Sequence, residues 1–198
     1  MYKDPIKGFI FDLDGTLVTS ELNFTEIKEN IGCPLDEDVL EYISQIQDDH
    51  RRKAAEMYVV EMELKDALNA TWICGAQCFL EQLHAHSIPM AIVTRNCRSA
   101  TSVKINNNHI PIKLVLTRED APSKPDPTAL QLIAKEWRME PSDIVYVGDY
   151  IYDIQAANRA NMRAWSFGFD AQGYPQNKVD KYFDSFTELN INEFVAQK

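Results

Sequence analysis

The chain has 198 residues, of which 45% are hydrophobic and 25% charged, and its formal net charge is −10. This length and composition are typical of a globular protein with one domain and room for a small inserted one. The negative charge argues against a general binder of nucleic acids or anionic membranes, because phosphate backbones require clustered Lys and Arg. An anionic small molecule remains possible, because it responds to the local field of a cleft and to any bound cation.

No apolar stretch reaches the roughly 18 residues of a membrane span, so we expect none. Residues 1–5 lack the apolar segment of a signal peptide. The cysteines contain no Cys-x-x-Cys pair, which indicates free thiols in a reducing cytoplasm rather than a zinc site. Cys74 and Cys78 have the i, i+4 spacing of two small core residues on one helix. We therefore expect a cytoplasmic protein that does not bind membranes.

The first predicted strand, residues 9–11, is followed by Asp12 and Asp14 and then by Gly15 and Thr16. An apolar run of this kind suits a parallel strand with both faces buried. Alternate side chains of a strand share a face, so the two carboxylates could converge where a divalent cation offsets their repulsion. Gly15 permits a sharp turn, and Thr16 can satisfy backbone donors of the next segment. The alternative is an ordinary solvated Asp-Gly turn.

Residues 20–70 carry no strong strand pattern but show three apolar stripes with helical spacing. The stripes are Phe24, Ile27 and Ile31, then Val39, Leu40, Ile43 and Ile46, and finally Ala55, Tyr58, Val59 and Met62. Gly32 and Pro34 are expected to end the first of these helices. The pattern predicts a small helical unit inserted after the first strand.

A basic run, Arg51-Arg52-Lys53, lies in this helical unit. One interpretation is contact with an anionic substrate. The other is a solvated helix face whose charges are balanced by the neighbouring Asp48 and Asp49.

Residues 88–167 alternate short apolar strands with helical patterns. The expected strands are residues 90–93, 113–116, 144–147 and 163–166, with a short one at 182–183. The expected helices begin near Ser99, behind Pro127 and around Ile151, and the last residues form a final helix. Such alternation predicts an α/β fold with a Rossmann-like, mostly parallel sheet flanked by helices, beside the small all-helical insert. Ligands of such sheets bind at the carboxyl ends of the strands.

Further polar residues follow these strands. Thr94 offers a hydroxyl and adjacent N–H groups that could hold a phosphoryl oxygen, or it caps a helix. Lys124 precedes two prolines, so a stiff loop could aim its ammonium at a carboxylate and a phosphate, although lone lysines are mostly solvated. Asp149 and Asp153 share a helix face at i, i+4 spacing, where acids also suit the helix dipole.

Four motifs taken together resemble those of the haloacid dehalogenase superfamily, in order and approximate spacing and over essentially the whole chain. They are Asp12-x-Asp14-Gly15-Thr16, Thr94, Lys124-Pro125 and Gly148-Asp149-x-x-x-Asp153. The helical insert between the first two motifs resembles the small cap of the class that includes phosphoglycolate phosphatases. We expect an α/β core at residues 1–16 and 73–198 and a helical cap at residues 17–72.

The resemblance implies that Asp12 is the nucleophile and forms an aspartyl-phosphate. Asp14 would protonate the leaving oxygen and then deprotonate the attacking water. The resemblance also implies a Mg²⁺ cofactor, bound by Asp12, by the backbone carbonyl of Asp14 and by Asp149.

The phosphate-binding residues implied by the resemblance are Thr94 and Lys124, which would offset the charge of the transferring group. Asp153 would contact the metal through water or orient Lys124. Arg95 stands where relatives commonly carry a small or amide residue. It is expected either to contact a second anionic group of the substrate or to point to solvent.

The resemblance implies a phosphatase that hydrolyses a small phosphorylated metabolite. Asp14 favours this over dehalogenation, because an alkoxide leaving group benefits from an acid and a halide does not. Alternatives are a phosphomutase, a phosphonatase with a cap lysine (Lys28, Lys53 or Lys65), and a non-catalytic binding or regulatory module. We expect a monomer or homodimer that binds no nucleic acid.

Overall fold

The computed structural model describes residues 5–169 and 176–194, in which one sheet of six parallel strands has the order β3-β2-β1-β4-β5-β6. The strands are β1 (Gly8–Phe11), β2 (Met90–Val93), β3 (Leu114–Leu116), β4 (Ile144–Gly148), β5 (Arg163–Phe167) and β6 (Lys181–Phe183). The predicted α/β fold with a parallel sheet is thus confirmed. Each expected strand differs from the observed one by at most one residue at either end.

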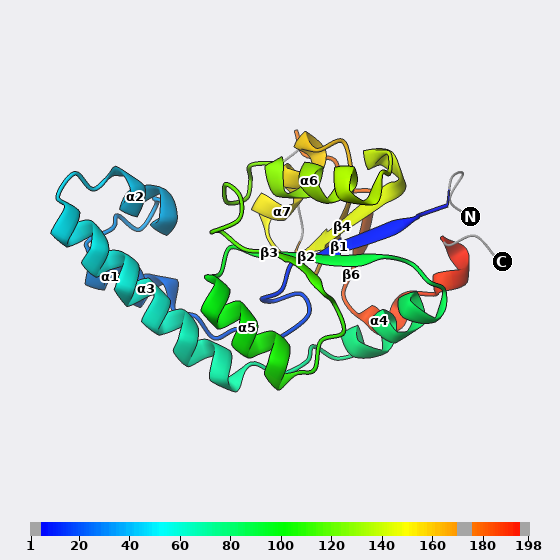
Figure 1. Ribbon diagram of the computed structural model, residues 1–198, viewed down its shortest axis with the longest axis horizontal. Coiled ribbons are helices and arrows are strands. Elements are labelled where there is room, and N and C mark those ends of the chain that lie inside the picture. Colours follow the sequence, from blue (N-terminus) through cyan, green and yellow to red (C-terminus); the bar gives the residue numbers. More distant parts are fainter. Residues whose placement is uncertain (1–4, 170–175, 195–198) are drawn as a thin grey trace.

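Helices cover both faces of the sheet (Figure 1). On one face lie α4 (Ala76–Ala85) and α5 (Arg98–Asn107), and on the other lie α6 (Thr128–Trp137) and α7 (Ile151–Arg159). Short 3-10 turns occur at η1 (Pro141–Asp143), η3 (Phe186–Glu188) and η4 (Ile191–Glu193). The expected final helix is therefore wrong for the described residues, and its last four positions, 195–198, lie outside them.

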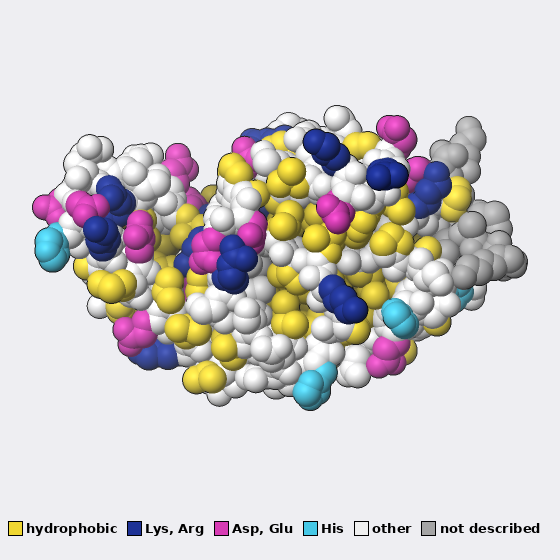
Figure 2. Space-filling view, viewed as in Figure 1, with side chains coloured by type: hydrophobic (Ala, Val, Ile, Leu, Met, Phe, Trp, Pro, Cys, Tyr) yellow, Lys and Arg dark blue, Asp and Glu magenta, His cyan; other side chains and the backbone are white. Residues whose placement is uncertain are grey.

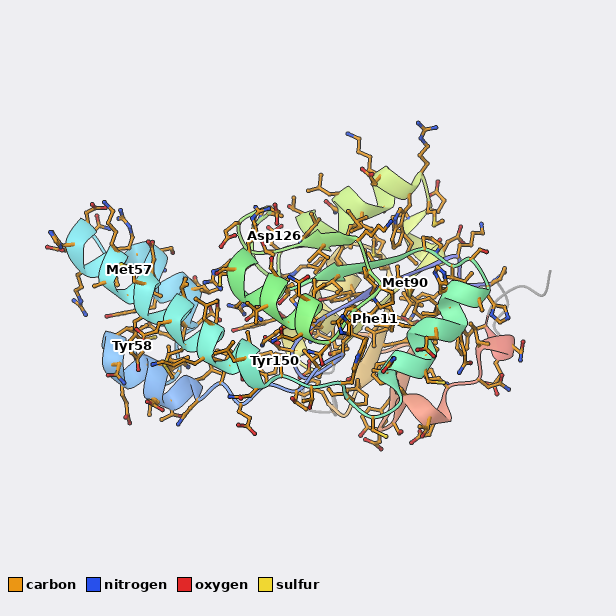
Figure 3. All side chains as sticks on the ribbon, turned by 60° about the horizontal axis from the view of Figure 1, so that its bottom comes forward. Phe11, Met57, Tyr58, Met90, Asp126 and Tyr150 are labelled. Carbon is orange, nitrogen blue, oxygen red and sulfur yellow. The ribbon has the colours of Figure 1, made fainter. Side chains whose placement is uncertain are left out.

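The helical insert predicted between the first two strands is confirmed. Its first three helices, α1 (Phe24–Ile31), α2 (Val39–Gln45) and α3 (Asp49–Asn69), form a lobe at the left of Figure 1. This lobe has its own apolar core, and Tyr58 lies between α3 and α1 in Figure 3. The C-cap Gly32 has φ 72°, a left-handed conformation that ends α1.

Apolar residues bury both faces of the central strand β1. Phe9 and Phe11 pack on the α4 side, where the rings of Phe9 and Phe79 meet edge to face at 5.7 Å. Ile10 points to the opposite face and packs with the residues of α6 and α7. Close packing on both sides fixes the end of β1, and with it the acidic residues that follow.

The two cysteines expected in the core are exposed, so that interpretation is wrong. Helix α4 begins only at Ala76, so Cys74 precedes it. Its buried face carries Phe79 and Leu83, and Cys78 faces away. Among the described residues, no helix combines the length and apolar character needed to cross a bilayer.

Candidate active site

The carboxyl ends of the strands meet the helical lobe at one cavity. The chain passes from β1 to β2 and β3 on one side and to β4, β5 and β6 on the other, so the strand order reverses beside β1. Such a reversal leaves a crevice at the strand ends. A cavity of about 560 Å³ lies there, lined by residues that follow the strands and by residues of α1, α2 and α3. In Figure 2 the outline is notched between the α1–α3 lobe and the body.

Lys124 is buried among acidic partners at the base of this cavity. Its Nζ lies 2.8 Å from Oδ1 of Asp12 and 2.6 Å from Oδ1 of Asp153. It also donates a hydrogen bond of 2.8 Å to the hydroxyl of Tyr146. Burial lowers the pKa of Lys124, but the charges of Asp12 and Asp153 outweigh it and raise the pKa above its ordinary value. The ammonium therefore stays charged and is fixed beside Asp12.

Three carboxylates form a cluster that could hold a metal ion. One oxygen atom from each of Asp12, Asp149 and Asp153 lies within 4.8 Å of the others. Burial, followed by the charge of Asp153, raises the pKa of Asp149 to about 6. Burial also raises the pKa of Asp12 well above its ordinary value, although Lys124 opposes the shift. Carboxylates that are buried and this close together favour binding of a cation that prefers oxygen ligands.

Gly15 and Thr16 shape the turn against Asp149. Gly15 has φ +74°, and a Cβ there would lie 2.2 Å from Oδ2 of Asp149, so this position requires glycine. The Thr16 hydroxyl donates a hydrogen bond of 2.8 Å to Oδ1 of Asp149. Thr16 was expected to satisfy backbone donors, and the structure corrects this: no helix follows directly, and its hydroxyl orients a carboxylate of the cluster.

Asp153 is held in the first turn of α7 by a close approach of the backbone. A Cβ at Gly148 would lie 2.3 Å from the Cβ of Asp153. One carboxylate oxygen accepts from the backbone N–H of Tyr150 at 3.0 Å, and the other accepts from Lys124 and from the hydroxyl of Tyr146. Asp153 thus contacts Lys124 directly, and its role in orienting Lys124 stays a prediction.

Asp14 lies on the cavity wall and is held by two side chains. The ammonium of Lys104 contacts its Oδ1, and the amide of Asn96 donates to its Oδ2. Burial raises the pKa of Asp14, and the contacts with Lys104 and Asn96 oppose this shift. A group that is largely buried yet lines the cavity is suited to exchanging a proton with a ligand.

Sequence reasoning missed Lys104, Asn96 and Tyr146. Asn96 lies two residues after Thr94, a proximity that could have signalled its role. Lys104 resembles any solvated helical lysine, and Tyr146 resembles any aromatic residue of a buried strand. Lys104 and Asn96 contact Asp14 across 90 and 82 residues, and Tyr146 contacts Lys124 across 22, so no local pattern reveals these three contacts.

Thr94 is buried and lines the cavity. Its hydroxyl oxygen accepts from the N–H of Asn96 at 3.1 Å, and its own N–H donates to the carbonyl of Leu116. Helix α5 is capped by Cys97, so Thr94 is not the capping residue. Its hydroxyl hydrogen remains available for a ligand oxygen.

Arg95 contacts the helical lobe rather than solvent. Its Nη2 donates to both carboxylate oxygens of Asp38, at 2.7 and 2.6 Å, and its guanidinium lies 4.7 Å from the ring centre of Tyr152. Arg95 lines the cavity, but its charge is already neutralised by Asp38.

The basic run of α3 lies outside the cavity lining. Arg52 and Lys53 both contact Asp49, and Arg51 donates to the hydroxyl of Tyr42 at 2.9 Å. In Figure 2, basic and acidic side chains lie next to one another on this lobe. These contacts favour the interpretation of the basic run as a solvated helix face over the interpretation that it contacts an anionic substrate.

The remaining cap lysines have partners as well. Lys28 lines the cavity, but its Nζ donates to the carbonyl of Leu35 at 2.7 Å. Lys65 is exposed and pairs with Glu61.

The chain is similar to known hydrolases in sequence and in fold. A sequence model of the haloacid dehalogenase-like hydrolase family matches residues 9–166. The validoxylamine A 7'-phosphate phosphatase of Streptomyces hygroscopicus subsp. limoneus is 30% identical over 176 residues, which cover 79% of this chain and 83% of that protein. The phosphoglycolate phosphatase of Pectobacterium atrosepticum is 24% identical over 212 residues, which cover 93% of this chain and 91% of that protein. A solved hydrolase structure from Pseudomonas syringae has a TM-score of 0.80 at 19% identity, covering 96% of this chain and 100% of that one.

Proposed function

The chain belongs to the haloacid dehalogenase-like hydrolases, and on this premise we propose that it is a Mg²⁺-dependent phosphatase acting on a small phosphorylated metabolite. The observation that carries the proposal is the placement of Asp12 beside the ammonium of Lys124, with Asp149 within 4.8 Å and Asp14 on the same cavity. Two relatives that are named phosphatases support the reaction class.

The acidic cluster suits Mg²⁺. Its donors are carboxylate oxygens without histidine or cysteine, and burial makes their charges costly without a cation. Asp12, Asp149 and the backbone carbonyl of Asp14 would hold the ion, while the oxygens of Asp153 are taken by protein donors. When bound, Mg²⁺ would offset the negative charge of the carboxylates and of the phosphoryl group.

In the first step, a carboxylate oxygen of Asp12 attacks phosphorus and the bond from phosphorus to the ester oxygen breaks. Asp14, protonated, donates its proton to that oxygen, so an alcohol leaves. The positive charge of Lys124 offsets the negative charge spread over the oxygens of the transferring group, and the hydroxyl of Thr94 binds one of those oxygens. The product is an aspartyl-phosphate on Asp12.

In the second step, water attacks the aspartyl-phosphate and Asp14, now a carboxylate, accepts its proton. Inorganic phosphate leaves and Asp12 is restored. One carboxyl group thus serves as acid and then as base, and a pKa raised by burial brings it closer to neutral pH for both roles.

The helical lobe is the proposed specificity element. We place the cap at residues 17–72 and the core at residues 1–16 and 73–198, because α1, α2 and α3 share a separate apolar core whereas α4 packs on the sheet. The cap covers the cavity, excludes water and selects the alcohol part of the substrate. We further propose a cytoplasmic location, on the basis of the free thiols.

The test is hydrolysis of 4-nitrophenyl phosphate with Mg²⁺ and with EDTA, followed by a panel of phosphorylated metabolites compared by kcat/KM. We expect Mg²⁺-dependent phosphate release, and its loss by a factor of at least about 10³ in Asp12→Asn. Asp143→Asn is the matched control, because Asp143 pairs with Lys7 at the opposite end of β4. No Mg²⁺-dependent hydrolysis of any panel member would favour a non-catalytic module instead.

A further inference from the structure

Lys104 is an ammonium buried on the inner face of α5, a place where lysine is rarely found. Its side chain is 0% exposed. Its Nζ contacts Oδ1 of Asp14 and lies 2.6 Å from Oδ2 of Asp66, which belongs to α3. Helices α5 and α3 pack side by side, as Figures 1 and 3 both show. Burial lowers the pKa of Lys104, but its two acidic partners outweigh this and raise the pKa, so it stays charged.

Lys104 has no direct access to a ligand. The residues that line the cavity include Asp14 and Asn96 but neither Lys104 nor Asp66. The ammonium lies behind Asp14, and any effect that it has on the reaction passes through that carboxyl group.

Asp14 is fixed at both of its oxygens. Lys104 holds Oδ1 and Asn96 holds Oδ2, so rotation of the carboxyl group would break both contacts. A carboxylate oxygen has more than one lone-pair site, so each oxygen can still exchange a proton with a ligand. The pair of donors therefore restricts orientation without blocking proton transfer.

The other partner of Lys104, Asp66, is fixed by the segment between β1 and α1. Oδ2 of Asp66 accepts from the hydroxyl of Ser20 at 3.0 Å, and Oδ1 accepts from the backbone N–H of Glu21 at 2.6 Å. The ammonium of Lys104 is thus held by Asp66 of α3, which the segment between β1 and α1 fixes in place, while it also contacts Asp14.

We propose that Lys104 is the positioning residue for Asp14, holding its carboxyl group in the orientation that delivers a proton to the leaving oxygen. This inference rests on the proposed phosphatase activity. Poor positioning of an acid costs most when the leaving group is a strong base, because only such a group must be protonated as it departs. Loss of Lys104 is therefore expected to depend on the leaving group.

The experiment compares kcat/KM for 4-nitrophenyl phosphate with kcat/KM for the best alkyl phosphate of the panel. In Lys104→Met, which keeps a long apolar side chain, we expect a loss of roughly 30-fold or more for the alkyl ester and less than about 5-fold for the nitrophenyl ester. Lys104→Gln, which keeps one N–H donor group, is expected to give a smaller loss with the same selectivity. Thermal melting of each variant checks that it folds, and Lys104→Gln serves if Lys104→Met does not fold.

The matched control is Arg118→Met, which removes another buried ion pair between the core and α3. Arg118 pairs with Glu63 and makes no contact with Asp14. It should change kcat/KM for both esters by the same factor. Equal losses for both esters in Lys104→Met would overturn the proposal and leave Lys104 with a structural role.

A second readout is a double-mutant cycle with Asp14→Asn, followed by release of radiolabelled phosphate from the alkyl ester. If Lys104 acts through Asp14, Lys104→Met lowers kcat/KM by less than about 2-fold in the Asp14→Asn background. A further loss there as large as in the wild-type background would contradict the proposal. Failure of the wild-type protein to hydrolyse any ester would instead contradict the proposed function.

Discussion

Among the single residues of the site, two carboxyl groups lie in the same buried region but have different partners. Asp12 lies beside Lys124 and the acidic cluster, whereas Asp14 lies beside Lys104 and Asn96. Burial raises the pKa of both. The fixed ammonium of Lys124 favours the charged form of Asp12, the proposed nucleophile, and the position of Asp14 on the cavity wall suits the proposed proton exchange.

Asp14→Asn separates the two chemical steps. Nitrophenolate is a good leaving group that needs no acid, so the first step should continue, while hydrolysis of the aspartyl-phosphate loses its base. Rapid-quench kinetics with 4-nitrophenyl phosphate should show a burst of about one nitrophenolate per active site, followed by turnover slowed roughly 10²-fold or more. A linear time course without a burst would count against Asp14 as the base of the second step.

We expect Asp149 to make metal binding depend on pH. Its pKa in the metal-free protein is raised to about 6, above its unfolded value, so its contribution to stability is present at low pH and is lost as pH rises through about 6. Above this pH Asp149 is ionised, and bound Mg²⁺ restores the lost stability by neutralising its charge. At lower pH a protonated Asp149 binds Mg²⁺ poorly. We compare both pH values at one Mg²⁺ concentration, about 100 times the Kd at pH 7.5. We expect Mg²⁺ to raise Tm by roughly 5–10 °C at pH 7.5 and by much less at pH 5.

Differential scanning calorimetry measures this shift, and Asp149→Asn is the control that should lose most of it at both pH values. An equal shift at pH 5 and pH 7.5 in the wild-type protein would exclude Asp149 as the titrating ligand.

At the scale of elements, the cap is joined to the core by buried or half-buried ion pairs. Asp38 at the start of α2 pairs with Arg95, and α3 contributes Glu63 to Arg118 and Asp66 to Lys104. The α3 contacts are the more deeply buried, whereas the Arg95–Asp38 pair is 24% and 19% exposed. We therefore expect α2 to separate from the core more readily than α3 when a substrate enters.

Asp38→Asn tests this order of opening. Asp38 also caps α2 by accepting from the N–H groups of Leu40 and Glu41, and asparagine is an equally good N-cap, so the substitution removes the charge pair alone. Hydrogen exchange followed by mass spectrometry should show faster exchange in α2 with little change in α3. Asp48→Asn, the same substitution at the N-cap of α3, should change neither helix. Unchanged exchange in α2 would mean that Arg95 does not hold the cap.

Local sequence patterns predicted the strands and cap helices, because the spacing of apolar residues along the chain directly shows which face of each element is buried. The C-terminal segment departs from its pattern because Phe186, Ile191 and Phe194 pack into the core beneath the sheet in short turns. The contacts of Lys104 and Arg95 could not be predicted from local sequence patterns. Their partners, Asp14 and Asp38, lie 90 and 57 residues away and meet them only in the folded chain.

At the scale of the whole molecule, the strand order accounts for the site. The central strand β1 lies between β2 and β4, so the residues that follow these three strands, Asp12, Thr94 and Asp149, meet at one edge. Lys124 follows β3 and reaches the same point. The helices α1, α2 and α3, inserted between β1 and β2, line the other side of a cavity of about 560 Å³ at this edge, a size compatible with the proposed small phosphorylated substrate.

The proposed mechanism passes a phosphoryl group through Asp12. The most direct measurement is acid quenching of the Asp14→Asn variant during its reaction with 4-nitrophenyl phosphate, followed by digestion and mass spectrometry. We expect one phosphoryl group on the peptide that contains Asp12, formed with Mg²⁺ and absent with EDTA. Mg²⁺-dependent release of nitrophenolate with no phosphoryl group on Asp12, or with one on another residue, would contradict it.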